Sequence, residues 1–187
     1  DWLVRGLVSS GMEGEDAQAL LDRAPLEIRV NRLKASRYTL ELPVAGIPLL
    51  ARNGLGIPSG SPVEAWEAFR EGKVEIQDGG SQIAAEAVGV AAGEFIVDLC
   101  AGTGGKALAL AADMGNTGTI LACDTDRTRL SRLAPRAARG GVTIVETLLL
   151  DPGKEAEALG QWRGKADAVL VDAPCSGTGT WRRNPET

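Results

Sequence analysis

The sequence predicts an α/β fold, a doubly wound, Rossmann-like parallel sheet preceded by a small α+β unit. Three observations predict it. Short apolar runs end in an acidic residue at four places, and the first of these runs leads into a glycine-rich turn and an apolar helical stretch. Strand, glycine turn and helix in that order are typical of ligand-binding α/β sheets. Nearer the amino end, segments in which apolar and polar residues alternate are separated by glycine- and proline-rich sequence, and this pattern predicts the smaller unit.

The amino-terminal part favours helices and strands in mixed order. Apolar spacing predicts an amphipathic helix over residues 13–23, which Pro25 blocks from continuing. Residues 26–30 and 73–76 alternate as strands do. Ser81 is expected to cap the helix that follows. We assign residues 1–72 to an accessory α+β domain and residues 73–187 to the Rossmann-like domain.

Four apolar runs supply the strands of the predicted parallel sheet. Each is followed or closed by an acid, which is expected at the carboxyl edge of the sheet, where ligands of such sheets bind. The runs are 95–99, 119–123, 148–150 and 168–171, and the acids are Asp98, Asp124, Asp151 and Asp172. Together they predict a cofactor that lies across this edge.

The loop Cys100–Lys106 is the predicted phosphate- or carboxylate-binding turn. Its glycines allow positive φ and close approach of a ligand, and the helix that follows offers free backbone amides. Gly102, Gly104 and Ala107 also fit a relaxed dinucleotide fingerprint, so an NAD site stays open at this point. Asp124 is placed to accept hydrogen bonds from a ribose, which NAD and S-adenosylmethionine both carry. Asp151 either accepts from an adenine amino group or caps the end of its strand.

Asp172 and Cys175 lie on either side of Pro174 in a loop that follows the last apolar run. A carboxylate there can hydrogen-bond a planar base, and a thiol can form a bond to carbon. From the residues alone Cys175 is the candidate nucleophile, since Cys100 lies in the glycine loop and Cys123 lies within a strand. A tight turn with an inert cysteine is the structural alternative.

These motifs resemble those of the Sun-type, RsmB-like RNA cytosine-5 methyltransferases. The resemblance covers nearly the whole chain and is carried by the segments 29–31, 69–72, 77–82, 98–106 and 172–185. Thr103 stands where the family usually has proline, and Gly79 where an acid is common. Neither departure removes a group that cofactor binding needs.

The resemblance implies the fold of an S-adenosylmethionine-dependent methyltransferase, here with an incomplete sheet. It also implies an RNA substrate, with ribosomal RNA as the first candidate. It implies Asp172 and Cys175 as catalytic residues and a contact between Pro174 and the target cytosine. Arg182 and Arg183 lie next to this loop, so they are candidates either for contacts to RNA phosphates or for structural pairs with carboxylates. No metal is implied. The implied cofactor residues are Cys100, Ala101, Gly102, Thr103, Gly104, Gly105, Lys106, Asp124, Arg129, Asp151 and Asp172.

The chemistry explains these residue types. A thiolate adds to C6 of cytosine, an acid near N3 stabilises the resulting charge, C5 takes the methyl group, and a base then removes the C5 proton. Family members attack with a second cysteine, in a Thr-Cys motif, and use the thiol equivalent to Cys175 for product release. No such second motif occurs in this sequence. We therefore expect a fragment that is inactive or weakly active alone.

Composition sets further bounds. The 187 residues, 44% of them hydrophobic, contain no histidine, which excludes His-dependent triads. Three scattered cysteines favour a reducing cytoplasm and no metal site. No run is long enough to span a membrane, and we expect a monomer for the full-length protein.

The net charge of −5 disfavours nucleic acid mildly, but distribution matters more than the total. Arg129, Arg132, Arg136 and Arg139 recur at helical spacing, which favours a solvated outer face over RNA contact. Pro135 predicts a kink or a new helix start in this segment. Two other functions stay open: a dinucleotide-dependent oxidoreductase and a non-catalytic RNA-binding module.

Overall fold

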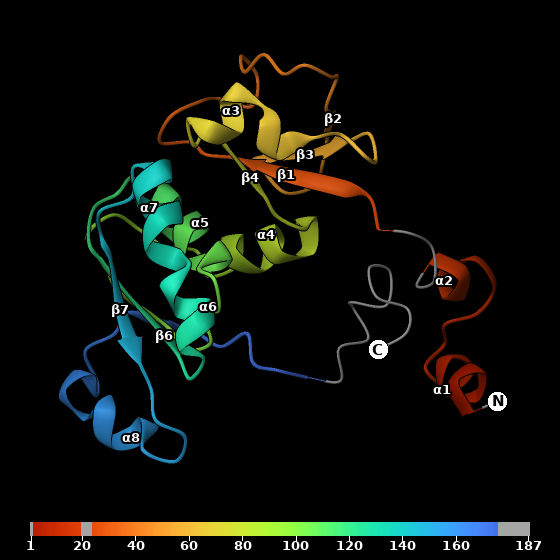
Figure 1. Cartoon of the computed structure of the whole chain (residues 1–187). Coiled ribbons are helices and arrows are strands. Elements are labelled where there is room, and N and C mark those ends of the chain that lie inside the picture. Colours follow the sequence, from red (N-terminus) through yellow and green to blue (C-terminus); the bar gives the residue numbers. More distant parts are fainter. Residues whose placement is uncertain (1, 20–23, 176–187) are drawn as a thin grey trace. The chain divides into compact units, whose positions relative to one another are not determined.

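The computed structural model describes residues 2–19 and 24–175, which fall into two compact units (Figure 1). Of the described residues, one unit contains 2–19, 24–25 and 174–175, and the other comprises 26–173. The first contains helices α1 (Trp2–Ser9) and α2 (Gly14–Ala19). The helix predicted over 13–23 is thus confirmed over 14–19, and residues 20–23 lie outside the described part.

The first half of the larger unit forms an antiparallel sheet, here called sheet A. Its strand order is β2-β3-β1-β4. Apolar side chains on β1, β3 and β4 pack with Val63 and Trp66 into one core. Its elements are β1 (Leu26–Val30), β2 (Ile47–Pro48), β3 (Gly54–Ile57), a 3-10 helix (Val63–Ala65), α3 (Glu67–Arg70) and β4 (Val74–Ile76).

Both strands predicted in this region are confirmed. Strand β4 lies beyond the boundary predicted at residue 72, yet it pairs with β1 along Val30 and Val74. The division into an accessory and a Rossmann-like domain stays a prediction.

The second half forms a parallel sheet, sheet B, with strand order β7-β6-β5-β8. The predicted α/β, Rossmann-like fold class is confirmed. The sequence predicted a strand at 148–150, but β7 begins three residues before Leu148. The predicted start was too late because exposed Glu146 and Thr147 interrupt the apolar run. The strands are β5 (Phe95–Asp98), β6 (Thr119–Asp124), β7 (Val145–Leu149) and β8 (Ala168–Leu170).

Helices cover sheet B, and apolar residues fill both of its faces. Ile96 and Ile120 pack with Leu110 and Leu133 on one face, and Val97 and its neighbours pack on the other. The alternation of Ile96 and Val97 follows the two-residue period of a strand. The helices are α4 (Gly79–Glu86), α5 (Gly105–Asp113), α6 (Arg127–Ser131), α7 (Leu133–Gly140), α8 (Glu155–Ala158) and a short 3-10 turn (Gly160–Trp162).

Two predictions about helix ends have different outcomes. Ser81 was expected to cap α4, but the cap is Asp78, whose side chain accepts a hydrogen bond from the Ser81 backbone N–H at 3.1 Å. The expected new start near Pro135 is confirmed, because α6 ends at Ser131 and α7 begins at Leu133. Pro135 lies in the first turn of α7, where its missing N–H has no intrahelical acceptor to lose.

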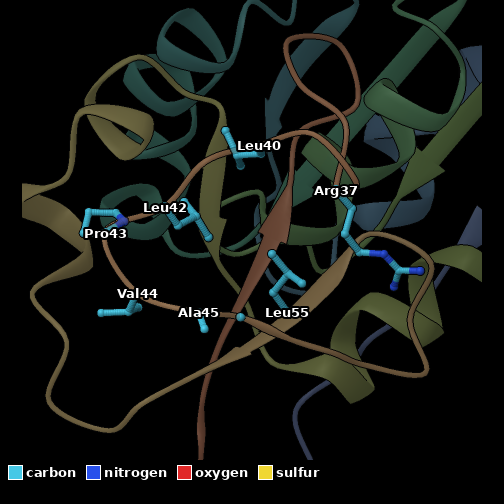
Figure 2. A pocket seen from close by; sticks show the side chains of 8 residues that line it. Arg37, Leu40, Leu42, Pro43, Val44, Ala45 and Leu55 are labelled. Atoms are coloured by element: carbon cyan, nitrogen blue, oxygen red, sulfur yellow. The ribbon is translucent and has the colours of Figure 1, made fainter.

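An open cavity of about 310 Å³ lies against sheet A. Figure 2 shows Leu40, Leu42 and Leu55 around it, with the Arg37 side chain at its margin. Arg37 Nη1 donates to the carbonyl of Ala51 at 3.1 Å, so this guanidinium is engaged in holding the loop. None of the site residues predicted from the sequence lines this cavity. Within the described residues, no helix combines the length and apolarity needed to cross a bilayer.

Candidate functional site

The glycine loop connects β5 to α5 at the carboxyl edge of sheet B. Gly102 and Gly104 have φ of 57° and 85°, which residues with side chains rarely adopt. A Cβ on Gly104 would lie 2.5 Å from Cγ of Leu133, whereas a Cβ on Gly102 would meet nothing within 4 Å. The loop is therefore packed against α7 at Gly104 and open at Gly102.

Asp124, at the end of β6, holds this loop in place. Its Oδ2 accepts a hydrogen bond from the Gly102 backbone N–H at 2.7 Å, and its Oδ1 accepts from the Asp126 N–H at 2.8 Å. A carboxylate offers about four lone-pair sites, so two bonds leave capacity for a ligand hydroxyl. The ribose role of Asp124 stays a prediction, but its positioning of the loop was missed from the sequence.

Asp98 ends β5 directly before the loop and is 1% exposed. Neither of its carboxylate oxygens has a hydrogen-bond partner in the described structure. Burial raises the pKa of Asp98 from its ordinary 3.8 to about 7, although the nearby Lys106 ammonium and the Ala107 backbone N–H lower it. A buried acid without a partner is a ready acceptor for a cationic ligand group.

Lys106 and Asp172 form an ion pair beside this loop, with Nζ 2.5 Å from Oδ2. Lys106 lies in the first turn of α5, and Asp172 follows β8, so the fold brings together residues far apart in the sequence. Lys106 is largely buried, whereas the Asp172 side chain is 58% exposed and accessible to a second ligand.

The three cysteines occupy different environments. Cys175 is exposed, Cys100 is half-buried and Cys123 is buried. Burial raises the pKa of Cys123 to about 12 and also raises that of Cys100, where the carboxylates of Asp124 and Asp98 add to the effect. Because thiolates are the reactive form, exposure makes Cys175 the most reactive of the three.

Comparison with known proteins agrees with this site. The family model for the 16S rRNA methyltransferase RsmB/F matches residues 86–187, more than half of the chain. The chain belongs to the RsmB/F family. It is 31% identical to the probable ribosomal RNA small subunit methyltransferase B of Bacillus subtilis over its whole length, and 35% identical to the Citrobacter koseri enzyme over 99% of it.

These comparisons also have a structural counterpart. A methyltransferase homologue from Pyrococcus horikoshii matches with a TM-score of 0.77 and 28% identity, over 88% of this chain and 55% of that one. The chain spans 43% and 44% of the lengths of the two curated relatives. The resemblance drawn from the motifs is confirmed, and so is the methyltransferase fold.

The RsmB/F family implies S-adenosylmethionine as the cofactor. The loop suits such a ligand in three respects. Asp98 offers an unpartnered buried carboxylate to a cationic amino group, and open space lies over Gly102. The first turn of the nine-residue helix α5 begins at Gly105 and supplies free amides near the loop.

The structure gathers some predicted RsmB/F site residues and separates others. It brings Asp124, Lys106 and Asp172 to the edge of sheet B together with the loop 100–105. Asp151 is exposed and its contact with adenine stays a prediction. Pro174 and Cys175 belong to the compact unit that contains α1 and α2, and Arg182 and Arg183 lie outside the described residues.

The arginine series differs from the solvated face that its spacing favoured. Arg129 is 63% exposed and pairs with Asp126 at 3.6 Å, but Arg136 and Arg139 are each 22% exposed and both pair with Glu75. The expectation was wrong for these two because Glu75, distant in sequence, carries a buried charge on β4 that needs cationic partners.

Proposed function

We propose that this chain carries the cofactor-binding part and a portion of the substrate site of an enzyme that methylates C5 of a cytosine in small-subunit ribosomal RNA. One observation carries the proposal: the glycine loop, the unpartnered Asp98 and the Lys106–Asp172 pair meet at one edge of a parallel sheet. The relatives' names support ribosomal RNA as the substrate.

Each residue has a distinct part in this proposal. S-adenosylmethionine, when bound, supplies an electrophilic methyl group. Asp98 accepts a hydrogen bond from the cofactor's amino group, and Asp124 fixes the loop and accepts from the ribose. Lys106 orients Asp172, whose exposed carboxyl faces the N3 edge of the target cytosine and stabilises the charge that forms when a thiolate adds at C6.

The thiol of Cys175 assists the last step in this proposal. After methyl transfer, loss of the C5 proton to a base allows the bond between C6 and the attacking sulfur to break, which restores the aromatic ring and the free thiolate. The attacking thiol belongs to the family's Thr-Cys motif, which is not in this sequence. We therefore expect cofactor binding without substantial turnover.

Calorimetric titration with S-adenosylmethionine and with NAD tests the cofactor assignment. We expect the chain to bind S-adenosylmethionine, and Asp124→Asn to weaken binding about tenfold through loss of an acceptor. Asp151→Asn tests the predicted adenine contact, and Glu146→Gln, which alters an exposed acid on β7 outside the predicted site, is the control. Binding of NAD instead would favour the oxidoreductase, which the glycine loop alone had left open.

A chemical assay is needed to identify which base of the RNA is methylated and at which atom. Small-subunit RNA incubated with the protein and cofactor is digested, and its nucleosides are identified by mass spectrometry. We expect at most a trace of product from the wild-type chain, present as 5-methylcytidine, and less from Asp172→Asn. A methyl group on another atom or base would exclude the proposed reaction, while RNA binding that ignores both cofactor and Asp172→Asn would favour a non-catalytic RNA-binding module.

A further inference from the structure

Arg136, on α7, connects the glycine loop to sheet A. Its Nη1 donates to both the backbone oxygen and Oγ1 of Thr103, each at 2.8 Å. Its Nη2 and Nε donate to Oε2 of Glu75 at 2.9 and 3.3 Å. All three nitrogens of one guanidinium are therefore engaged, two with β4 and one with the loop.

The Glu75 end of this connection is firmly anchored. The Glu75 side chain is 5% exposed, and Arg139 Nη2 donates to its second carboxylate oxygen. Arg29 is buried nearby, where burial lowers its pKa to about 10 and the charge of Glu75 opposes that shift. A buried carboxylate among cations is costly to displace, so Glu75 provides a fixed point for Arg136.

The Thr103 end lies in a loop whose neighbouring residues are held by Asp124 and by packing of Gly104 against Leu133, while Thr103 itself is held by Arg136. Thr103 stands between Gly102 and Gly104, and glycine has the greatest backbone freedom of any residue type. The neighbouring backbone contacts are made by Ala101 and Gly102, to Cys123 and Asp124. Arg136 supplies the two long-range hydrogen bonds to Thr103, and both are charge-assisted and largely shielded from water.

We propose that Arg136 is a positioning residue for cofactor binding: through Thr103 it holds the loop 100–104 in its ligand-binding conformation, with Glu75 as its anchor. This inference rests on the proposed function, since the loop is taken to bind S-adenosylmethionine. Arg136 itself makes no contact with the reacting atoms. Arg136 acts on the conformational equilibrium of the loop. In a variant without Arg136, fewer molecules hold the loop in the binding conformation, and the affinity for the cofactor falls in proportion to that fraction.

Arg139 provides a matched control on the same helix. It pairs with the same Glu75 carboxylate and lies over the Phe69 ring at 3.9 Å, but no hydrogen bond joins it to the loop in the described structure. Arg136→Met and Arg139→Met each leave Glu75 with one of these two partners. Any general effect of weakening the buried ion cluster is therefore shared, and only the first variant releases the loop.

The first measurement is the dissociation constant for S-adenosylmethionine by titration calorimetry. We expect Arg136→Met to weaken binding about tenfold, equivalent to one charge-assisted hydrogen bond, and Arg139→Met to change it less than about twofold. Thr103→Val removes the hydroxyl acceptor and is expected to weaken binding about threefold, with Thr103→Ser recovering that loss. The Arg136→Met and Thr103→Val effects should be less than additive in the double variant.

The second measurement does not need the cofactor. Amide hydrogen exchange of residues 101–106 in the ligand-free protein should accelerate in Arg136→Met and Thr103→Val but not in Arg139→Met. Equal exchange and equal affinities in the two arginine variants would overturn the inference. If the wild-type chain fails to bind S-adenosylmethionine while the loop exchange still separates these variants, the proposed function fails but the control of the loop by Arg136 stands.

Discussion

Asp98 carries the most perturbed carboxyl of the site. Its pKa of about 7 in the folded protein exceeds the ordinary 3.8, so the native state holds a proton that the unfolded chain releases between these values. The contribution of Asp98 to stability is then most favourable below pH 4, falls as the pH rises towards 7, and levels off above it. The difference corresponds to about 4 kcal/mol at most.

Asp98→Asn tests this linkage. The amide cannot ionise, so the variant should lose the decline in unfolding free energy between pH 4 and pH 7 that Asp98 contributes. Urea denaturation of both proteins at pH 5 and pH 8 measures it, and the variant should gain stability relative to wild type at pH 8. If the unfolding free energy changes between pH 5 and pH 8 by the same amount in the variant and in the wild type, Asp98 ionises normally in the folded protein.

Cysteine reactivity provides a second test at the scale of single residues. Iodoacetamide at pH 8 should modify exposed Cys175 first, Cys100 more slowly because burial raises its pKa, and Cys123 only after unfolding. Peptide mass spectrometry over time gives the three rates. Early modification of Cys123 would contradict the buried environment described for β6.

The placement of Asp124 and Asp172 at the carboxyl edge of sheet B was predictable from their positions after apolar runs, and their roles in binding and catalysis stay predictions. Asp98 was recognised as a strand-end acid, but no role could be assigned, because its burial without a partner depends on how α5 packs over β5. The contact between Arg136 and Thr103 was equally inaccessible. It depends on Glu75, which lies on another sheet and has no local sequence signal.

At the scale of elements, β1, β4 and the four strands of sheet B follow from alternation and apolar runs, whereas β2 and β3 lie in glycine- and proline-rich sequence that gave no such pattern. The start of β7 did not follow from its apolar run, because Glu146 and Thr147 are exposed and polar within a strand that pairs with β6. Helix α7 was predicted to start afresh, but its inward-facing arginines were not. Their partners are supplied by tertiary structure, which helical spacing cannot reveal.

The glycine loop allows a test that separates folding from binding. Gly104→Ala would force a Cβ against Leu133 at positive φ, and should cost about 2–4 kcal/mol of stability from strain and overpacking. Gly102→Ala meets open space, so it should cost only about 1 kcal/mol of stability yet weaken S-adenosylmethionine binding. Urea denaturation and calorimetry measure the two effects. Similar stability losses in both variants would contradict the close packing at Gly104.

At the scale of the whole larger unit, sheets A and B are joined by buried polar contacts. Asn31 follows β1 and is 4% exposed. Its Nδ2 donates to the carbonyl of Gly72 at 2.9 Å and to that of Gly140, the last residue of α7, at 2.8 Å. Lys34 Nζ adds hydrogen bonds to the carbonyls of Glu71 and Arg139. One short segment thus ties the end of α7 to the turn before β4.

These contacts predict that the two sheets unfold together and that Asn31 couples them. Asn31→Ala leaves two carbonyls without this donor and should cost about 3 kcal/mol. Hydrogen exchange should then show β1 and β4 losing protection at lower urea than β5 and β6. Arg32→Ala is the matched control, because its ion pair with Asp113 is half exposed and contributes little. If Asn31→Ala costs no more than Arg32→Ala, or if the sheets already unfold separately in the wild type, Asn31 is not what makes residues 26–173 a single cooperative unit.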